Sequence, residues 1–175
     1  LKVYPGDSIA LIGKNGAGKT TLSRVVASEM GFEFIEEQCR YNKSVIEGVE
    51  TPETLVEINA LQESMAFESM NGSVNGVVCD TAAMELRMWS KVKFEIDIEC
   101  PIEVPIDLNF LCQTLEEFEE DPLRQMPDYT DRIEHEKEFL EFIHSEGVRV
   151  KILAPATLEE RKKKVISSIK KLANV

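Results

Sequence analysis

Eight consecutive residues near the N-terminus carry the strongest chemical signal in the sequence. Residues 13–20 read Gly-Lys-Asn-Gly-Ala-Gly-Lys-Thr, a complete G-x-x-x-x-G-K-T pattern, between an apolar run and a helical segment. The glycines let backbone N–H groups turn inward around phosphate oxygens, Lys19 reaches the β- and γ-phosphates, and the Thr20 hydroxyl binds Mg²⁺. The pattern therefore predicts a site for ATP and Mg²⁺, and its ATP-binding residues are Gly13, Lys14, Asn15, Gly16, Ala17, Gly18, Lys19, Thr20 and Thr21.

A second acidic group is expected at the end of another buried strand, where it holds the magnesium through water. The run Val77-Val78-Cys79-Asp80 fits, because Asp80 follows directly on apolar residues. An ordinary turn aspartate is the alternative interpretation. Beside a phosphate loop, we favour Asp80 as a metal residue together with Thr20.

Transfer of a phosphoryl group to a small acceptor needs two further parts. One is an acid that orients the acceptor hydroxyl, and the other is a set of cations that neutralise the moving group. Glu36 and Glu37 follow the second apolar run, near the sheet edge where ligands of α/β proteins bind. Arg124 precedes an acidic helix, and Arg132 follows two turns later. We predict catalytic roles for Lys19, Glu37, Arg124 and Arg132, with a lid over residues 116–132.

The flanks of the loop suggest a different class of protein. Residues 6–13, followed by NGAGKTTL, resemble the start of an ABC-type ATPase, and this likeness ends near Ser23. No LSGGQ-like signature follows, and Thr81 stands where an ABC motor places the glutamate that activates water. We therefore favour a kinase and keep a partner-regulated P-loop ATPase, or a nucleotide-dependent switch, as the alternative.

Five apolar runs alternate with segments of helical character, which is typical of a parallel sheet covered on both faces. The predicted strands are Ser8–Gly13, Phe32–Glu36, Val74–Asp80, Asp107–Cys112 and Val148–Leu153. The predicted helices are Lys19–Met30, Glu53–Met70, Ala82–Ser90, Asp131–Glu146 and Thr157–Ala173. Residues 91–105 stay unassigned between helix and strand. The sequence predicts a three-layer α/β P-loop NTPase fold with a central five-stranded parallel sheet, as a single domain over residues 1–175.

Composition and charge limit the partners. Lys and Arg number 20 against 32 Asp and Glu, so the net charge is −12, and 43% of residues are hydrophobic. This acidic balance disfavours nucleic acid and anionic membranes, and no apolar run approaches the ~20 residues that span a bilayer. We expect a small-molecule substrate and leave a homo-oligomer open. The basic run Arg161–Lys164 is expected on the solvated face of its helix.

The four cysteines bear on compartment. Cys39, Cys79, Cys100 and Cys112 are widely spaced and form no C-x-x-C pair. Reduced, mostly buried thiols are the expected state, without a zinc site, and the predicted location is cytoplasmic.

The order of the motifs resembles the ribosylnicotinamide kinase domain of NadR-type proteins, which are thymidylate-kinase-like P-loop enzymes. The resemblance runs from Ser8 to about Leu172. Glu37-Gln38-Cys39-Arg40 is similar to the family's Glu-x-x-Arg after the second strand, and Gln62 to its helical glutamine. Asp80 and Thr81 resemble its Asp-Thr-Asp strand end. Trp89 is similar to the tryptophan of its following helix, although core packing is the alternative role for Trp89.

The same family has a lid after its fourth strand, and residues 118–124, Phe-Glu-Glu-Asp-Pro-Leu-Arg, resemble it. The resemblance implies Mg-ATP-dependent phosphorylation of a ribosyl 5′-hydroxyl, with nicotinamide riboside as the first substrate. The implied substrate residues are Glu37, Arg40, Gln62, Thr81 and Trp89. Three positions depart from the family: Ala82 replaces the second Asp, Phe118 replaces a Trp, and Pro122 replaces a Gly. These departures leave open a related nucleoside, nucleotide or vitamin as the acceptor, and an inactive nucleotide-binding relative as a third class.

Overall fold

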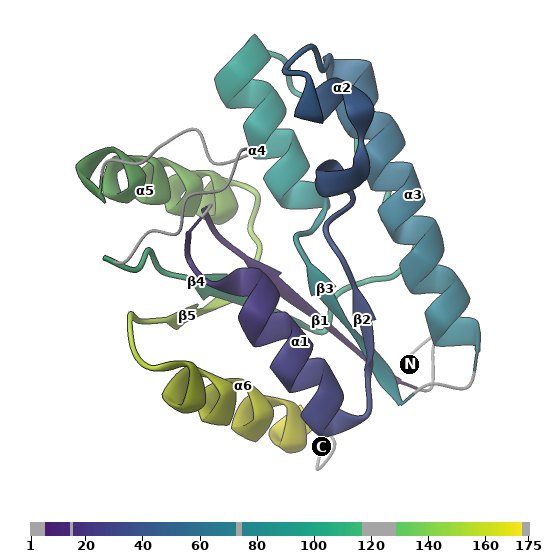
Figure 1. The fold of residues 1–175 in the computed structure, drawn as a ribbon, viewed down its shortest axis with the longest axis vertical. Helices are drawn as coiled ribbons and strands as arrows, with labels where there is room; N and C mark the ends of the chain where they lie inside the picture. The colour runs from purple at the N-terminus through teal and green to yellow at the C-terminus, as the bar shows by residue number, and fades with distance from the viewer. Residues whose placement is uncertain (1–5, 15, 73–74, 117–128, 173–175) are drawn as a thin grey trace.

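Five parallel strands form one sheet in the order β2-β3-β1-β4-β5, with β1 at its centre (Figure 1). The computed structural model describes residues 6–14, 16–72, 75–116 and 129–172. The strands are β1 (Asp7–Ile12), β2 (Glu33–Ile35), β3 (Gly76–Asp80), β4 (Leu108–Cys112) and β5 (Val150–Leu153). The predicted five-stranded parallel sheet is confirmed.

Helices cover both faces of the sheet, which gives the predicted three layers. The main helices are α1 (Lys19–Met30), α3 (Pro52–Asn71), α4 (Ala83–Phe94), α5 (Tyr129–Ser145) and α6 (Leu158–Leu172). Helices α1 and α6 lie together on one face, where their apolar residues share a core with alternate residues of β1, β3 and β4. Helices α3, α4 and α5 contribute to the cores on the opposite face.

The central strand explains why the strands read as continuous apolar runs. Successive side chains of a strand point to opposite faces. In β1, Ile9 and Leu11 lie in the core beneath α1 and α6, whereas Ala10 and Ile12 lie in the core beneath α4 and α5. All four side chains are completely buried. A strand covered on both faces needs apolar residues at every position, and the sequence supplies them.

The ambiguous segment 91–105 is divided between helix and irregular chain. Helix α4 continues to Phe94 and ends at Glu95, whose φ of 58° is left-handed. The following residues pair with no strand among the described parts of the chain. Ile98 and Val104 are buried in the cores beside α3, whereas Ile96 is 48% exposed. Ile98 and Val104 therefore anchor an irregular segment to the cores, and these residues add no sixth strand to the described sheet.

Two short elements between β2 and α3 had no counterpart in the sequence prediction. They are the 3₁₀ helix η1 (Gln38–Tyr41) and the one-turn helix α2 (Lys43–Ile46). Asn42 links them, because its side-chain oxygen accepts a hydrogen bond from the Val45 N–H at 3.3 Å. Four residues show too little periodicity to be recognised in a sequence.

Three of the four cysteines, Cys39, Cys79 and Cys112, are buried, as expected, and Cys100 is partly buried. Burial raises the pKa of the Cys79 thiol to about 12. None of the helices in the described ranges is both long and apolar enough to cross a bilayer.

Candidate active site at the phosphate loop

The loop between β1 and α1 depends on glycine at the predicted positions. Gly13, Gly16 and Gly18 have φ values of 136°, 86° and 70°, in the region that favours glycine. A Cβ atom on Gly13 would lie 2.5 Å from the carbonyl oxygen of Cys112 on β4. Glycine is therefore required here by the backbone conformation and the close approach of β4, as well as by the space that a phosphate group needs. The loop leads directly into α1, whose first residue is Lys19.

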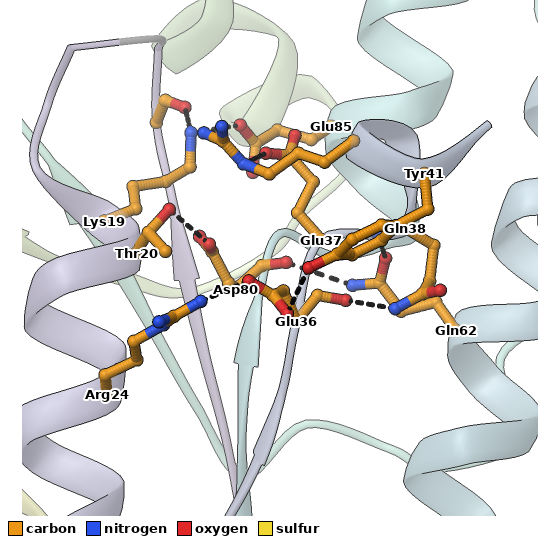
Figure 2. Close-up of polar contacts among 12 residues, drawn as sticks. Lys19, Thr20, Arg24, Glu36, Glu37, Gln38, Tyr41, Gln62, Asp80 and Glu85 are labelled. Carbon is orange, nitrogen blue, oxygen red and sulfur yellow. Dashed lines mark hydrogen bonds and ion pairs between the residues drawn. The ribbon is translucent and has the colours of Figure 1, made fainter. Parts of the chain in front are cut away.

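Lys19 lies inside the site rather than in solvent. Its ammonium group donates a hydrogen bond to the Gly13 carbonyl and lies 3.1 Å from Oε1 of Glu85 (Figure 2). Burial acts to lower the pKa of Lys19, but the negative charges of Glu85, Glu37 and Asp80 outweigh it and raise that pKa. Lys19 is therefore a fixed cation beside the phosphate loop.

Thr20 of the phosphate loop and Asp80 at the end of β3 are in direct contact. The Thr20 hydroxyl donates a 2.6 Å hydrogen bond to Oδ2 of Asp80, which ends β3 and is completely buried. Burial raises the pKa of Asp80. Its other oxygen, Oδ1, has no hydrogen-bond partner within the described residues. A hydroxyl and a carboxylate with an unused oxygen are the hard ligands that Mg²⁺ prefers, so these residues fit a magnesium ion.

The two glutamates after β2, Glu36 and Glu37, have different partners. Glu36 accepts a 2.6 Å hydrogen bond from the Tyr41 hydroxyl and pairs with Arg24 of α1. Glu37 instead pairs with Arg40, whose Nε lies 3.3 Å from Oε2 of Glu37. Glu37 is also one of the charges that raise the pKa of Lys19. Glu37 and Arg40 therefore lie close enough to the phosphate loop to act on the charges of Lys19 and Asp80, whereas the carboxylate of Glu36 is held by Arg24 and Tyr41.

Gln62 joins three elements through its amide group. Its Nε2 donates to the carbonyl oxygens of Asp80 (3.2 Å) and Thr81 (2.8 Å), and its Oε1 accepts from the Gln38 N–H at 3.5 Å. Thr81 is buried and has a φ of 80°, which is an outlier for a β-branched residue. Gln62 thus fixes the turn after β3, and with it the position of Asp80.

Two other predicted residues make contacts within the chain. Trp89 on α4 is partly buried and packs against the apolar cluster of Cys39, Val45, Leu55, Ile58, Leu86 and Ile98. The guanidinium of Arg132 is buried; it donates to the carbonyl oxygens of Leu115 (3.0 Å) and Glu116 (3.4 Å). Arg132 therefore anchors the start of α5 to the chain that follows β4. Arg124 and Phe118, in the predicted lid, lie outside the described residues.

The remaining loop residues differ in environment. Lys14 Nζ lies 3.4 Å from Nδ1 of His135 on α5, and burial lowers the pKa of Lys14. Thr21 is exposed on α1, and Asn15 lies outside the described residues. Ala17 is completely buried.

The expectation that Arg161 faces solvent is wrong. Arg161 is 2% exposed, and its NH1 donates a 2.8 Å hydrogen bond to the Ala17 carbonyl of the phosphate loop. The capping box of Thr157 with Glu160 sets the start of α6. Arg161 follows Glu160 on the buried face of this helix, whereas Lys163 is exposed. In a run of four basic residues, the residue types alone do not show which side chain lies on the buried face of α6.

Glu85 is the second residue beside the phosphate loop that the sequence analysis missed. It lies in the first turn of α4 and is the ion-pair partner of Lys19. The resembling family has a carboxylate at the position of Ala82, and the signal in this sequence was the acid three residues later, Glu85.

The comparisons with known proteins agree with this geometry. A family model described as an AAA domain matches residues 8–161. The chain belongs to this AAA domain family. Its structure is similar to NadR protein in complex with NR, with a TM-score of 0.66 and 20% identity, over 98% of this chain and 52% of that chain. It is also similar to deoxyadenosine kinase from M. mycoides, with a TM-score of 0.64 and 12% identity, over 94% of this chain and 99% of that chain.

These likenesses confirm the predicted P-loop fold and the resemblance to NadR-type proteins, and this AAA domain spans about half of the NadR chain. A curated relative, a putative ABC transporter ATP-binding protein from Treponema denticola, is 69% identical over 26 residues. That match covers 15% of this chain and 5% of the relative. Its short extent fits the likeness of the loop and its flanks to ABC-type ATPases.

Replacing Arg161 by methionine in this AAA domain is expected to weaken ATP binding about tenfold, because a charge-assisted hydrogen bond that shapes the loop is lost. The exposed Lys163→Met substitution on the same helix is the matched control and should leave the affinity unchanged. Calorimetric titration with a non-hydrolysable ATP analogue measures both. Equal affinities for the two variants would contradict a role of Arg161 in shaping the loop.

The pH dependence of stability should carry a contribution from Glu85. Burial raises the pKa of Glu85 to about 7 from an ordinary 4.5, against the opposing charge of Lys19. The folded protein therefore holds this proton over a pH range in which the unfolded chain has lost it, and the stabilisation disappears as pH rises through about 7. Urea unfolding should show the stability of the wild type relative to Glu85→Gln falling between about pH 5 and pH 8. A difference that is constant or rises with pH would be the opposite result.

Proposed function

We propose that this protein is an ATP-dependent phosphotransferase that phosphorylates a hydroxyl group of a small, nucleoside-like acceptor. The observation that supports this most is the grouping of Lys19, Thr20, Asp80 and Glu37 around one space at the carboxyl ends of β1, β2 and β3 (Figure 2). A phosphate-binding cation, a metal-binding pair and a separate acid are the parts that phosphoryl transfer requires.

Each residue then has a defined task. Lys19 holds the β- and γ-phosphates, and Thr20 and Asp80 hold Mg²⁺, which neutralises charge on the phosphates when it is bound. Glu37 orients the acceptor hydroxyl and accepts its proton. As the acceptor oxygen bonds to the γ-phosphorus, the bond from that phosphorus to the bridging oxygen breaks, and ADP leaves with that electron pair. Arg40 stabilises the carboxylate of Glu37 and adds positive charge.

Nicotinamide riboside is our first candidate for the acceptor. The likeness to NadR protein in complex with NR supports it, and the likeness to a deoxyadenosine kinase supports nucleosides more broadly. We propose that Arg40, Thr81 and Trp89 border the acceptor. For Gln62 we propose a positioning role, because both ends of its amide are bound to the backbone.

An ADP-release assay against a panel of acceptors tests this proposal. The panel begins with nicotinamide riboside and continues with other nucleosides, nucleoside monophosphates and thiamine, each with Mg-ATP. We expect ADP release that depends on one acceptor class and that leaves a phosphorylated product. ADP release at the same rate with every acceptor would overturn the kinase proposal.

A partner-regulated ATPase or nucleotide-dependent switch is the second candidate. The 26-residue match to a putative ABC transporter ATP-binding protein favours it. Against it, Thr81 follows Asp80 where that class needs a glutamate to activate water. This candidate predicts slow hydrolysis that a protein partner accelerates, with no small molecule phosphorylated.

A further inference from the structure

The first turn of α4 holds a carboxylate that the proposed mechanism does not use. The Asp-Thr-Asp pattern has its second acid at the position of Ala82, which offers no ligand atom in its side chain. Ala82 is the N-cap of α4 and Glu85 is the third residue of the helix. Side chains at these two helix positions lie beside one another, as the capping box illustrates. A carboxylate at position 85 can therefore reach the space that one at position 82 would fill.

The contacts of Glu85 place it at the phosphate site. Its Oε1 lies 3.1 Å from Lys19 Nζ, the cation that holds the nucleotide phosphates in our proposal. Lys19 is 6% exposed, so this is a sheltered ion pair and not a surface contact. Because phosphate oxygens need the same ammonium group, ATP and Glu85 compete for Lys19, and bound ATP releases Glu85 Oε1 to another partner.

Two carboxylate oxygen atoms in this region are buried without a hydrogen-bond partner among the described residues. They are Oδ1 of Asp80 and Oε2 of Glu85. Asp80 is completely buried, so its unused oxygen is costly unless a ligand or an ordered water meets it. Two carboxylates flanking one lysine are mutually repulsive once phosphates draw that lysine away, and a divalent cation with its water shell relieves this repulsion.

We propose that Glu85 supplies the second carboxylate of the magnesium–nucleotide site, in place of the acid missing at position 82, and holds Lys19 until the phosphates bind. This inference rests on the proposed function, because it needs ATP at residues 13–20. It assigns two acids to the site, Asp80 directly after β3 and Glu85 one turn into α4. It also explains how the chain tolerates Ala82.

The test measures binding of a non-hydrolysable ATP analogue with and without Mg²⁺, and no acceptor is present. For Glu85→Gln we expect the gain in affinity that Mg²⁺ provides to fall about tenfold, a coupling of ordinary size between two bound ligands. Without Mg²⁺, the same variant should bind the analogue about threefold more tightly, because nothing then competes for Lys19. Glu68→Gln, at an exposed position of α3, removes the same charge elsewhere and should match the wild type.

The decisive variant moves the carboxylate from position 85 to position 82. The double variant Glu85→Gln with Ala82→Asp should recover most of the Mg²⁺-dependent gain. The proposal is overturned if Glu85→Gln keeps the full gain, or if the double variant folds and recovers none of it. If Glu85→Gln does not fold, the single variant Ala82→Asp decides the question. If Glu85 already supplies the second carboxylate, the added acid is redundant and changes the Mg²⁺-dependent gain less than about twofold. An increase of about tenfold in that gain would show that Glu85 does not take the place of the acid missing at position 82.

These outcomes separate the inference from the proposed function. The binding assay contains no acceptor, so Glu85 can show its predicted effect even if the acceptor panel gives no phosphorylated product. In that case phosphoryl transfer is wrong and the assignment of Glu85 stands. In the reverse case, the protein phosphorylates an acceptor but Glu85→Gln keeps the full Mg²⁺-dependent gain in affinity; the kinase proposal then stands and the assignment of Glu85 is wrong.

Discussion

The Lys19→Ala variant is expected to lose ADP release with any acceptor, by about a thousandfold or more in kcat. Lys19 is the cation at the phosphate loop, and stabilisation of charge on the transferred group is the largest contribution that a phosphotransferase makes. The measurement is steady-state ADP release at saturating Mg-ATP and acceptor. The exposed residue Lys163, changed to alanine, is the matched control and should keep the wild-type rate.

The fold should survive the loss of Lys19. The substitution removes the ion-pair partner of Glu85, but burial already raises the pKa of Glu85 to about 7, so this carboxyl can take a proton instead of remaining an unpaired charge. Circular dichroism should give a native spectrum and cooperative unfolding. An active Lys19→Ala protein would contradict the mechanism, whereas an unfolded one would show that the ion pair is needed for stability.

The second large effect is expected for Glu37→Gln. An amide of the same size cannot accept the proton of the acceptor hydroxyl, so kcat should fall about a hundredfold or more. The affinity for Mg-ATP should stay within about threefold of the wild-type value, because Lys19, Thr20 and Asp80 are unchanged. Steady-state kinetics with acceptor and with ATP as the varied substrate separate these two effects.

The neighbouring residue provides the matched control. Glu36→Gln changes the same side chain one position earlier, but Glu36 is held by Arg24 and Tyr41 away from Lys19. We expect Glu36→Gln to keep kcat within about twofold of wild type. If Glu36→Gln is as impaired as Glu37→Gln, the acid has been assigned to the wrong residue or to neither.

The parts of the fold that sequence analysis could predict are those that local pattern specifies. Strands β1, β3 and β4 are apolar at successive positions because helices cover both faces of the sheet, and the glycine pattern marks the loop between β1 and α1. The predicted bounds of α1 agree with the structure at both ends. Local pattern fails for η1 and α2, which are too short to show a period.

The site was predicted least well where a role depends on contacts between distant parts of the chain. Arg161 lies in a run of basic residues, and only the packing of α6 against α1 turns it toward the Ala17 carbonyl. Glu85 has no motif of its own, and its contact with Lys19 depends on the turn that Gln62 fixes after β3. Such contacts follow from the fold rather than from residue types.

The most direct test of the central claim is to follow the γ-phosphate itself. Mass spectrometry and phosphorus NMR of a reaction with Mg-ATP and nicotinamide riboside, or another acceptor from the panel, identify where the phosphate goes. We predict a phosphorylated acceptor in amounts equal to the ADP formed, and none with Lys19→Ala. Inorganic phosphate in amounts equal to the ADP, with every acceptor unchanged, would contradict the account and identify an ATPase.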